Sequence, residues 1–216
     1  MRSKLDQELD LLNYQLISMG SMCEDAIKLA MKSLFEKNID LAINAIEMDK
    51  KVDCLERDIE SLCLRLLLQQ HPVAKDFRII SAALKMISDI ERIGDQASDI
   101  AEISEYISDK TIKSWYYIKE MADASIKMVT KSIDSFVKRD IELANEVIND
   151  DDIVDDLFVK TKAAIINDII DKSDDGENYL DLFMISKYLE RVADHATNIA
   201  EWVLYSITGK HDEMNE

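Results

Sequence analysis

Acidic side chains recur one helical turn apart in two copies of one segment. The first copy covers residues 91–102 and the second covers residues 190–201, and seven of the twelve positions are identical. A helix has 3.6 residues per turn, so acids spaced by four residues share one face. The acids at this spacing are Glu91, Asp95 and Asp99 in the first copy and Glu190 and Asp194 in the second. Stacked carboxylates of this kind can bind cations.

A second pair of acids precedes each of these segments. Residues 41–53 resemble residues 143–155, and the two stretches are 102 positions apart. The acids of this pair are Asp49 and Asp53 in the first half and Asp151 and Asp155 in the second. If the helices of each half form an antiparallel hairpin, both sets of acids lie at similar distances from its turn. Four carboxylates then face one another in each half, with a looser match in the second.

Two interpretations of these acids remain open. Apolar residues such as Ile90 and Ile93 lie beside the carboxylates, so the acidic face borders the core, and charge there is costly unless cations neutralise it. Carboxylate oxygens from two helices suit magnesium, manganese or iron. The alternative is a solvated face that is neutralised by basic side chains, namely Arg57, Arg92, Lys187 and Arg191.

The elements that must position these acids are helices. The chain has 216 residues, of which only one is proline and four are glycine, and apolar residues recur at helical spacing. The predicted helices cover about 4–36, 39–69, 73–107, a fourth ending near 138, a fifth ending near 172, and a sixth ending near 208. With a seam at 108–111, the expected fold is all-α: two tandem three-helix bundles at residues 1–108 and 109–216.

Charge and motifs exclude several classes of function. A net charge of −18 argues against direct binding of nucleic acid, anionic lipid or free phosphate. The most hydrophobic run, residues 62–68, is too short to span a bilayer, and no apolar signal core opens the chain, so we expect a cytoplasmic protein. The three cysteines are expected to be reduced. There is no Glu-x-x-His, phosphate-loop or His-Glu-x-x-His motif, so we expect no enzyme.

The repeated segments resemble the duplicated acidic motif of the PhoU family of phosphate-signalling regulators. The resemblance rests on ERIGD at residues 91–95, ERVAD at 190–194, PVAKDFR at 72–78 and DQEL at 6–9. It implies a pair of three-helix bundles, commonly homodimeric, with multinuclear iron or zinc, or with magnesium or manganese, on the acidic motifs. It also implies a negative regulator that links the phosphate ABC transporter ATPase to a phosphate-sensing histidine kinase and meets the membrane only through these partners.

The family's ligand positions fall on Glu91, Asp95, Glu190 and Asp194, with the facing acids of each half opposite them. The two sites are unequal at two aligned positions of the repeat. Asp99 aligns with Asn198, and Gln96 aligns with His195. The alternative function is a metal-free acidic helical adaptor or chaperone-like scaffold. Its acids would supply solubility and a docking surface for a basic partner.

Overall fold

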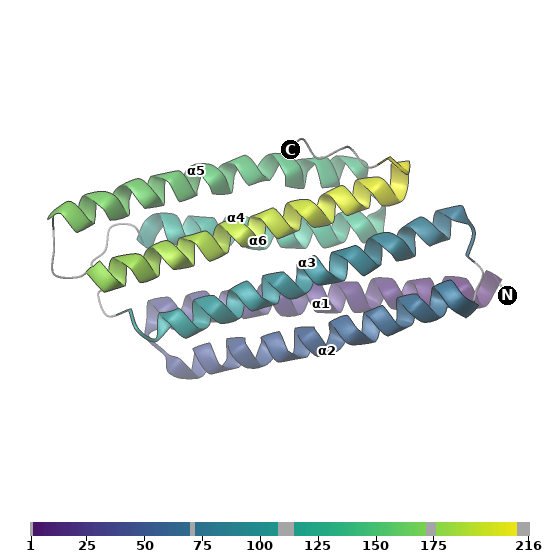
Figure 1. Cartoon of the computed structure of the whole chain (residues 1–216), viewed down its shortest axis with the longest axis horizontal. Helices are drawn as coiled ribbons and strands as arrows, with labels where there is room; N and C mark the ends of the chain where they lie inside the picture. The colour runs from purple at the N-terminus through teal and green to yellow at the C-terminus, as the bar shows by residue number, and fades with distance from the viewer. Residues whose placement is uncertain (1, 70–71, 108–114, 172–175, 211–216) are drawn as a thin grey trace.

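Six long helices make up the part of the chain that the computed structural model describes, which is residues 2–69, 72–107, 115–171 and 176–210. Their bounds are α1 Arg2–Glu36, α2 Ile39–Gln69, α3 Ala74–Ser104, α4 Trp115–Lys138, α5 Ile141–Asp171 and α6 Gly176–Thr208. The predicted all-α fold of two tandem three-helix units is confirmed (Figure 1). No helix in this part of the chain combines the length and apolar character that a membrane span requires.

The short turns of the two halves repeat each other. Lys37 and Arg139 both adopt left-handed backbone conformations, with φ of 55° and 54°. The next residue in each half caps a helix: Asn38 Oδ1 accepts from the amide of Asp40 at 3.0 Å, and Asp140 Oδ1 accepts from that of Leu143 at 3.1 Å. The internal repeat of the sequence therefore extends to the backbone of these two turns.

The third helix is shorter than its predicted range of 73–107. It begins after Val73, which has an extended backbone, and it ends at Ser104. Beyond that point the amide of Tyr106 donates to the carbonyl of Ile103, an i→i−3 bond that closes a tighter turn. The predicted seam at 108–111 lies outside the described residues.

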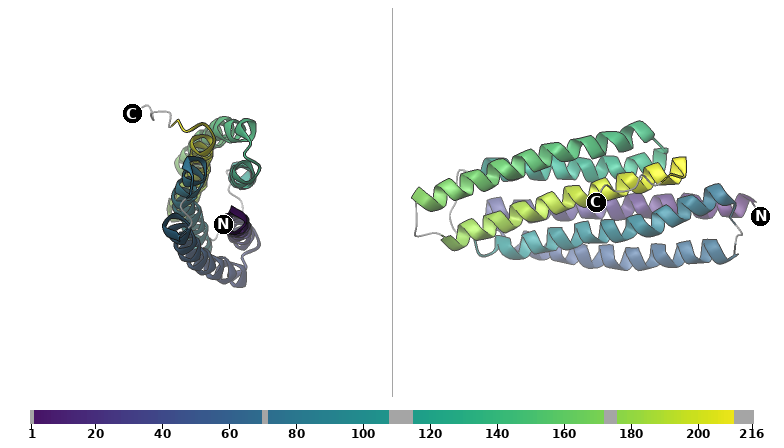
Figure 2. Two further views of the ribbon diagram at one scale, coloured as in Figure 1. Left: turned by 90° about the vertical axis from the view of Figure 1, so that its right-hand side faces the viewer. Right: turned by 45° about the horizontal axis from the view of Figure 1, so that its top comes forward.

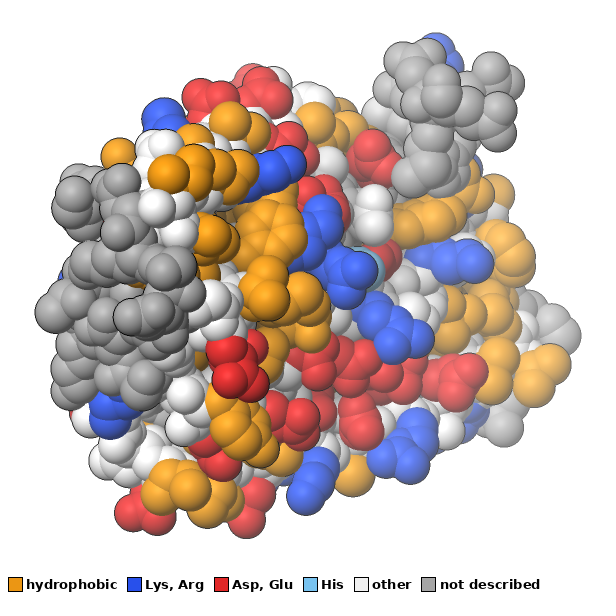
Figure 3. Space-filling view, turned by 60° about the vertical axis from the view of Figure 1, so that its left-hand side comes forward, with side chains coloured by type: hydrophobic (Ala, Val, Ile, Leu, Met, Phe, Trp, Pro, Cys, Tyr) orange, Lys and Arg blue, Asp and Glu red, His pale blue; other side chains and the backbone are white. Residues whose placement is uncertain are grey.

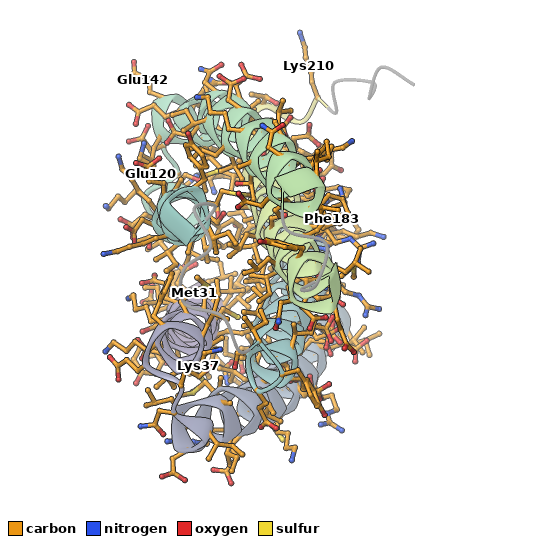
Figure 4. The ribbon with its side chains drawn as sticks, turned by 90° about the vertical axis from the view of Figure 1, so that its left-hand side faces the viewer. Met31, Lys37, Glu120, Glu142, Phe183 and Lys210 are labelled. Atoms are coloured by element: carbon orange, nitrogen blue, oxygen red, sulfur yellow. The ribbon has the colours of Figure 1, made fainter. Side chains whose placement is uncertain are left out.

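The two halves pack against each other through α3 and α6, and α1 also contacts α4. Viewed along the helices, α2, α3, α6 and α5 form a curved layer with α1 and α4 on its inner side (Figure 2). Met31 of α1 and Glu120 of α4 lie on that inner side, away from Phe183 of α6 (Figure 4). Thus α3 and α6, which carry the repeated acidic segments, lie next to each other at the centre of the molecule.

Each helix buries an apolar stripe. On α3 and α6 the stripe includes small residues: Ala97, Ala101, Ala196 and Ala200 are fully buried. Small side chains allow neighbouring helices to approach closely, and burial of the larger apolar residues supplies the main driving force for folding. The acids at four-residue spacing lie along the border of this stripe, so the core determines where they point.

Candidate metal centre

Three of the predicted acids come together in the first half. Asp49 and Asp53 of α2 and Asp95 of α3 each place one carboxylate oxygen within 4.8 Å of the other two. All three side chains are half-buried. Among the residues that the structure describes, no other three His, Cys, Asp or Glu residues meet at this spacing. We call these three residues the acidic triad.

A glycine makes room for the triad. Gly94 of α3 is buried against α2, and a Cβ at this position would lie 2.8 Å from Asp49 Oδ1 and 3.3 Å from Val52 Cγ1. Asp49 Oδ1 is itself buried and accepts no hydrogen bond from any described group. A buried carboxylate oxygen without a donor is costly, so this atom is suited to a bound cation.

The triad concentrates negative charge that nearby protein groups only partly neutralise. Burial, together with the negative charges of the neighbouring Asp53 and Asp95, raises the pKa of Asp49 from 3.8 to about 6. Burial also raises the pKa of Glu91, and Asp95 adds to the effect. Glu91 therefore lies beside the triad but is not one of its three residues. A cation bound at the triad would relieve the repulsion among these carboxylates.

Arg92 neutralises the outer edge of this cluster. Its Nη1 donates to Asp95 Oδ2 at 2.8 Å, and its Nε lies 3.5 Å from Glu91 Oε2. The guanidinium side chain is 60% exposed, so this pair is weak. The alternative of neutralisation by basic side chains thus holds at the rim, whereas no basic side chain among the described residues forms such a pair with Asp49. Figure 3 shows acidic side chains gathered next to basic ones on this face.

The second half places its acids differently. Burial raises the pKa of Asp151 to about 6, with Asp155 and Asp194 adding to the shift, so negative charge is concentrated here too. Asp155 and Asp194 are nevertheless exposed. Glu190 accepts a hydrogen bond from Lys187, whose ammonium lies 5.5 Å from the centre of the Phe158 ring. The predicted four-acid face is therefore looser here, as the hairpin distances indicated.

The contact between α3 and α6 pairs residues whose contacts were not predicted from the sequence. Asp89 Oδ1 lies 2.9 Å from His195 Nδ1 and accepts from Asn198 Nδ2 at 3.1 Å. Asp99, a candidate ligand, instead bonds the Tyr188 hydroxyl of α6. In the internal repeat, Asp89 aligns with Tyr188 and Asp99 aligns with Asn198. Each of the two acids on α3 therefore bonds the residue of α6 that aligns with the other acid, and this pattern could have indicated the two contacts.

The donor atoms favour hard divalent cations. Carboxylate oxygens suit magnesium, manganese and iron, whereas zinc prefers nitrogen and sulfur. Cys23 and Cys63 are buried, and burial raises the pKa of the Cys63 thiol to about 12. The Cys54 sulfur is exposed and lies 3.8 Å from Arg57 Nη2. The acidic triad thus fits a metal ion on three grounds: its oxygen donors, the orphaned Asp49 oxygen and the space left by Gly94.

Comparison with known proteins gives matches along the whole chain. The model of the PhoU domain matches residues 16–104 and again 118–203. A phosphate-specific transport system accessory protein PhoU homolog from Clostridium acetobutylicum is 34% identical over 220 residues, which cover 100% of this chain and 99% of the relative. Its counterpart from Aquifex aeolicus is 34% identical, with 99% and 98% covered.

Solved structures with the same fold come from two further organisms. PhoU from Pseudomonas aeruginosa superposes with a TM-score of 0.90 at 28% identity, covering 95% of this chain and 99% of that one. The phosphate transport system regulatory protein PhoU from Streptococcus pneumoniae superposes with a TM-score of 0.89 at 24% identity, with 97% and 100% covered. The second likeness concerns the fold alone.

Proposed function

Because the chain belongs to the PhoU family, we propose that it is a negative regulator of phosphate uptake and of the phosphate starvation response. Relatives that match it from end to end are named accessory proteins of the phosphate-specific transport system, and like them the chain is a non-catalytic accessory protein. The single observation that carries the proposal is the paired PhoU-domain match, one in each half.

The proposed role is that of an adaptor in the cytoplasm, and a homodimer is its proposed form. It would contact the ATPase of the phosphate ABC transporter and a phosphate-sensing histidine kinase, and reach the membrane only through them. With a net charge of −18 the surface repels phosphate, so the state of the transporter must reach the adaptor through protein contacts. An acidic surface attracts a basic surface on a partner, and this association weakens as salt screens the charges.

Metal binding on the acidic faces is the second part of the proposal. Asp49, Asp53 and Asp95 would hold a divalent cation in the first half, with Glu91 beside it. The buried Asp49 Oδ1 supports this assignment, because no group in the described part of the chain donates a hydrogen bond to it. A bound cation would lower the charge of this surface and thereby change its affinity for a basic partner.

Deletion of the gene tests the regulatory role. We expect phosphate-uptake genes to stay switched on at high phosphate, and expression of the intact chain to restore their repression. Pull-down with the transporter ATPase and the histidine kinase at low and high salt tests the adaptor role. Normal phosphate response in the deletion strain contradicts the regulator, and failure to bind either partner at low salt contradicts the adaptor. Either result favours the metal-free scaffold.

A further inference from the structure

The two acidic faces are repeats of one design, but they differ in the residues that decide whether a cation can enter. We propose, on the basis of the metal binding put forward above, that the first half holds the tight metal site. In the second half, the tethered ammonium of Lys187 takes the place of a metal ion. The chain would then bind metal unequally, with a tight site at the acidic triad and a much weaker one at Asp151, Asp155 and Asp194.

The first difference is the space available to the ligand. Gly94 leaves Asp49 Oδ1 where a Cβ would approach it to 2.8 Å, a distance that such atoms do not tolerate. The repeat places Ala193 at the position equivalent to Gly94, and Asp151 at that equivalent to Asp49. Asp151 therefore cannot lie against α6 in the way that Asp49 lies against α3. This agrees with the finding that three described acids converge in the first half alone.

The second difference is a built-in cation. Lys187 and Glu190 form an ion pair in which the lysine side chain is 36% exposed and the glutamate only 14%. The ring of Phe158 lies under the ammonium and helps to hold it in place. An ammonium that is fixed beside carboxylates satisfies part of their charge and repels an incoming metal ion.

The first half lacks both parts of this device. The residue equivalent to Lys187 is the exposed Ser88, and the one equivalent to Phe158 is Glu56. Glu56 follows Asp53 by three residues on α2, which places it on the same side of the helix, so its carboxylate adds negative charge beside the triad. Where the second half has a cation above a ring, the first half has a hydroxyl and another acid.

One further difference runs the other way and does not cancel these. In the internal repeat Arg57 aligns with Val159, so the first half has a basic residue where the second has an apolar one. Its Nε, however, donates to the backbone carbonyl of Asp53 at 3.1 Å and leaves the triad oxygens open. Arg92 donates to Asp95 Oδ2 and lies 3.5 Å from Glu91 Oε2. Each half thus pairs a base with an acid at a predicted ligand position. Arg92 does so from a side chain that is 60% exposed, whereas that of Lys187 is only 36% exposed.

Titration of the full chain with Mn²⁺ after removal of metals by a chelator tests this inference. The readouts are calorimetry, elemental analysis and the paramagnetic resonance signal of free Mn²⁺. We expect one tight event and one much weaker event. Asp53→Asn should abolish the tight event, and Gly94→Ala should weaken it about 10- to 100-fold, as expected for loss of ligand support. Lys187→Ser should strengthen the weak event about tenfold or more.

Controls separate a local effect from a failure to fold. Circular dichroism should show unchanged helicity in every variant, and Lys85→Ser, which removes an exposed lysine from α3, should leave both events as they are. Two equal Mn²⁺ sites in the wild type, or no gain in Lys187→Ser, would overturn the inequality while leaving metal binding in place. If the chain binds no Mn²⁺ at all, metal binding itself is wrong. The gene-deletion experiment tests phosphate regulation independently of both of these results.

Discussion

Replacing Asp49 by asparagine should stabilise the protein in the absence of metal. The carboxylate is half-buried among other acids, and its pKa rises from 3.8 to about 6. A shift of about two units corresponds to at most about 3 kcal/mol of unfavourable charge. Solvent screens a side chain that is only half-buried, so we expect Asp49→Asn to gain about 1–2 kcal/mol at pH 7 in chelator.

The pH dependence follows from the same shift. Because the pKa is higher in the folded state than in the unfolded state, the folded protein binds the proton more tightly. The charge penalty is therefore absent below about pH 3.8 and fully present above about pH 6, and the wild type loses stability as the pH rises through this range. The advantage of Asp49→Asn over the wild type should accordingly grow from pH 4 to pH 7.

Urea unfolding followed by circular dichroism measures both effects. Asp58→Asn, which changes an exposed acid on the same helix, is the matched control and should show no comparable gain. Adding Mn²⁺ should reverse the order, since metal stabilises only the folded state that can bind it. If Asp49→Asn is less stable than the wild type in chelator at pH 7, then the carboxylate makes a favourable contact and the reasoning about the triad is wrong.

Three further predictions concern the scaffold. Asp89→Ala removes the acceptor shared by His195 and Asn198 and should cost about 1–3 kcal/mol in urea unfolding; a loss below 0.5 kcal/mol would mean that the cross-link contributes little, since that is the ordinary range for surface changes. Asn38→Ala removes a helix cap and should cost about 1 kcal/mol, seen as a lower melting temperature with unchanged helicity. A fragment of residues 1–107 should fold as a helical bundle with a cooperative melt, less stable than the full chain because it lacks α6; a disordered fragment would instead favour one six-helix core.

Much of the fold follows from local pattern. Helical periodicity, one proline and the polar turns at Lys37 and Arg139 are sufficient to locate the six helices, because these signals act within a few residues. The triad is also predictable, since the spacing of Asp49 and Asp53 and their distance from the hairpin turn bring them level with Asp95. A hairpin of two long helices has little freedom in its register.

The features that sequence analysis missed depend on contacts between distant segments. No periodicity indicates that α3 packs against α6, so the bonds from Asp89 to His195 and from Tyr188 to Asp99 were not predicted. The spacing rule assigned Asp99 to the metal ligands because it lies one turn beyond Asp95. It does not show that a hydroxyl from the other half bonds to that carboxylate. Nor does it show that Gly94 is present to make room for Asp49.

The contact between α3 and α6 also bears on how a duplicated protein diverges. Two identical copies of the first half, related by a twofold axis, would set Asp89 against Asp99 at both ends of the contact, and like charges would repel there. In the fused chain the partners are Asn198 and Tyr188, which donate hydrogen bonds to those two acids. A symmetric homodimer cannot change one side alone. Covalent linkage of the halves removes that constraint, and each face is free to acquire its own charge.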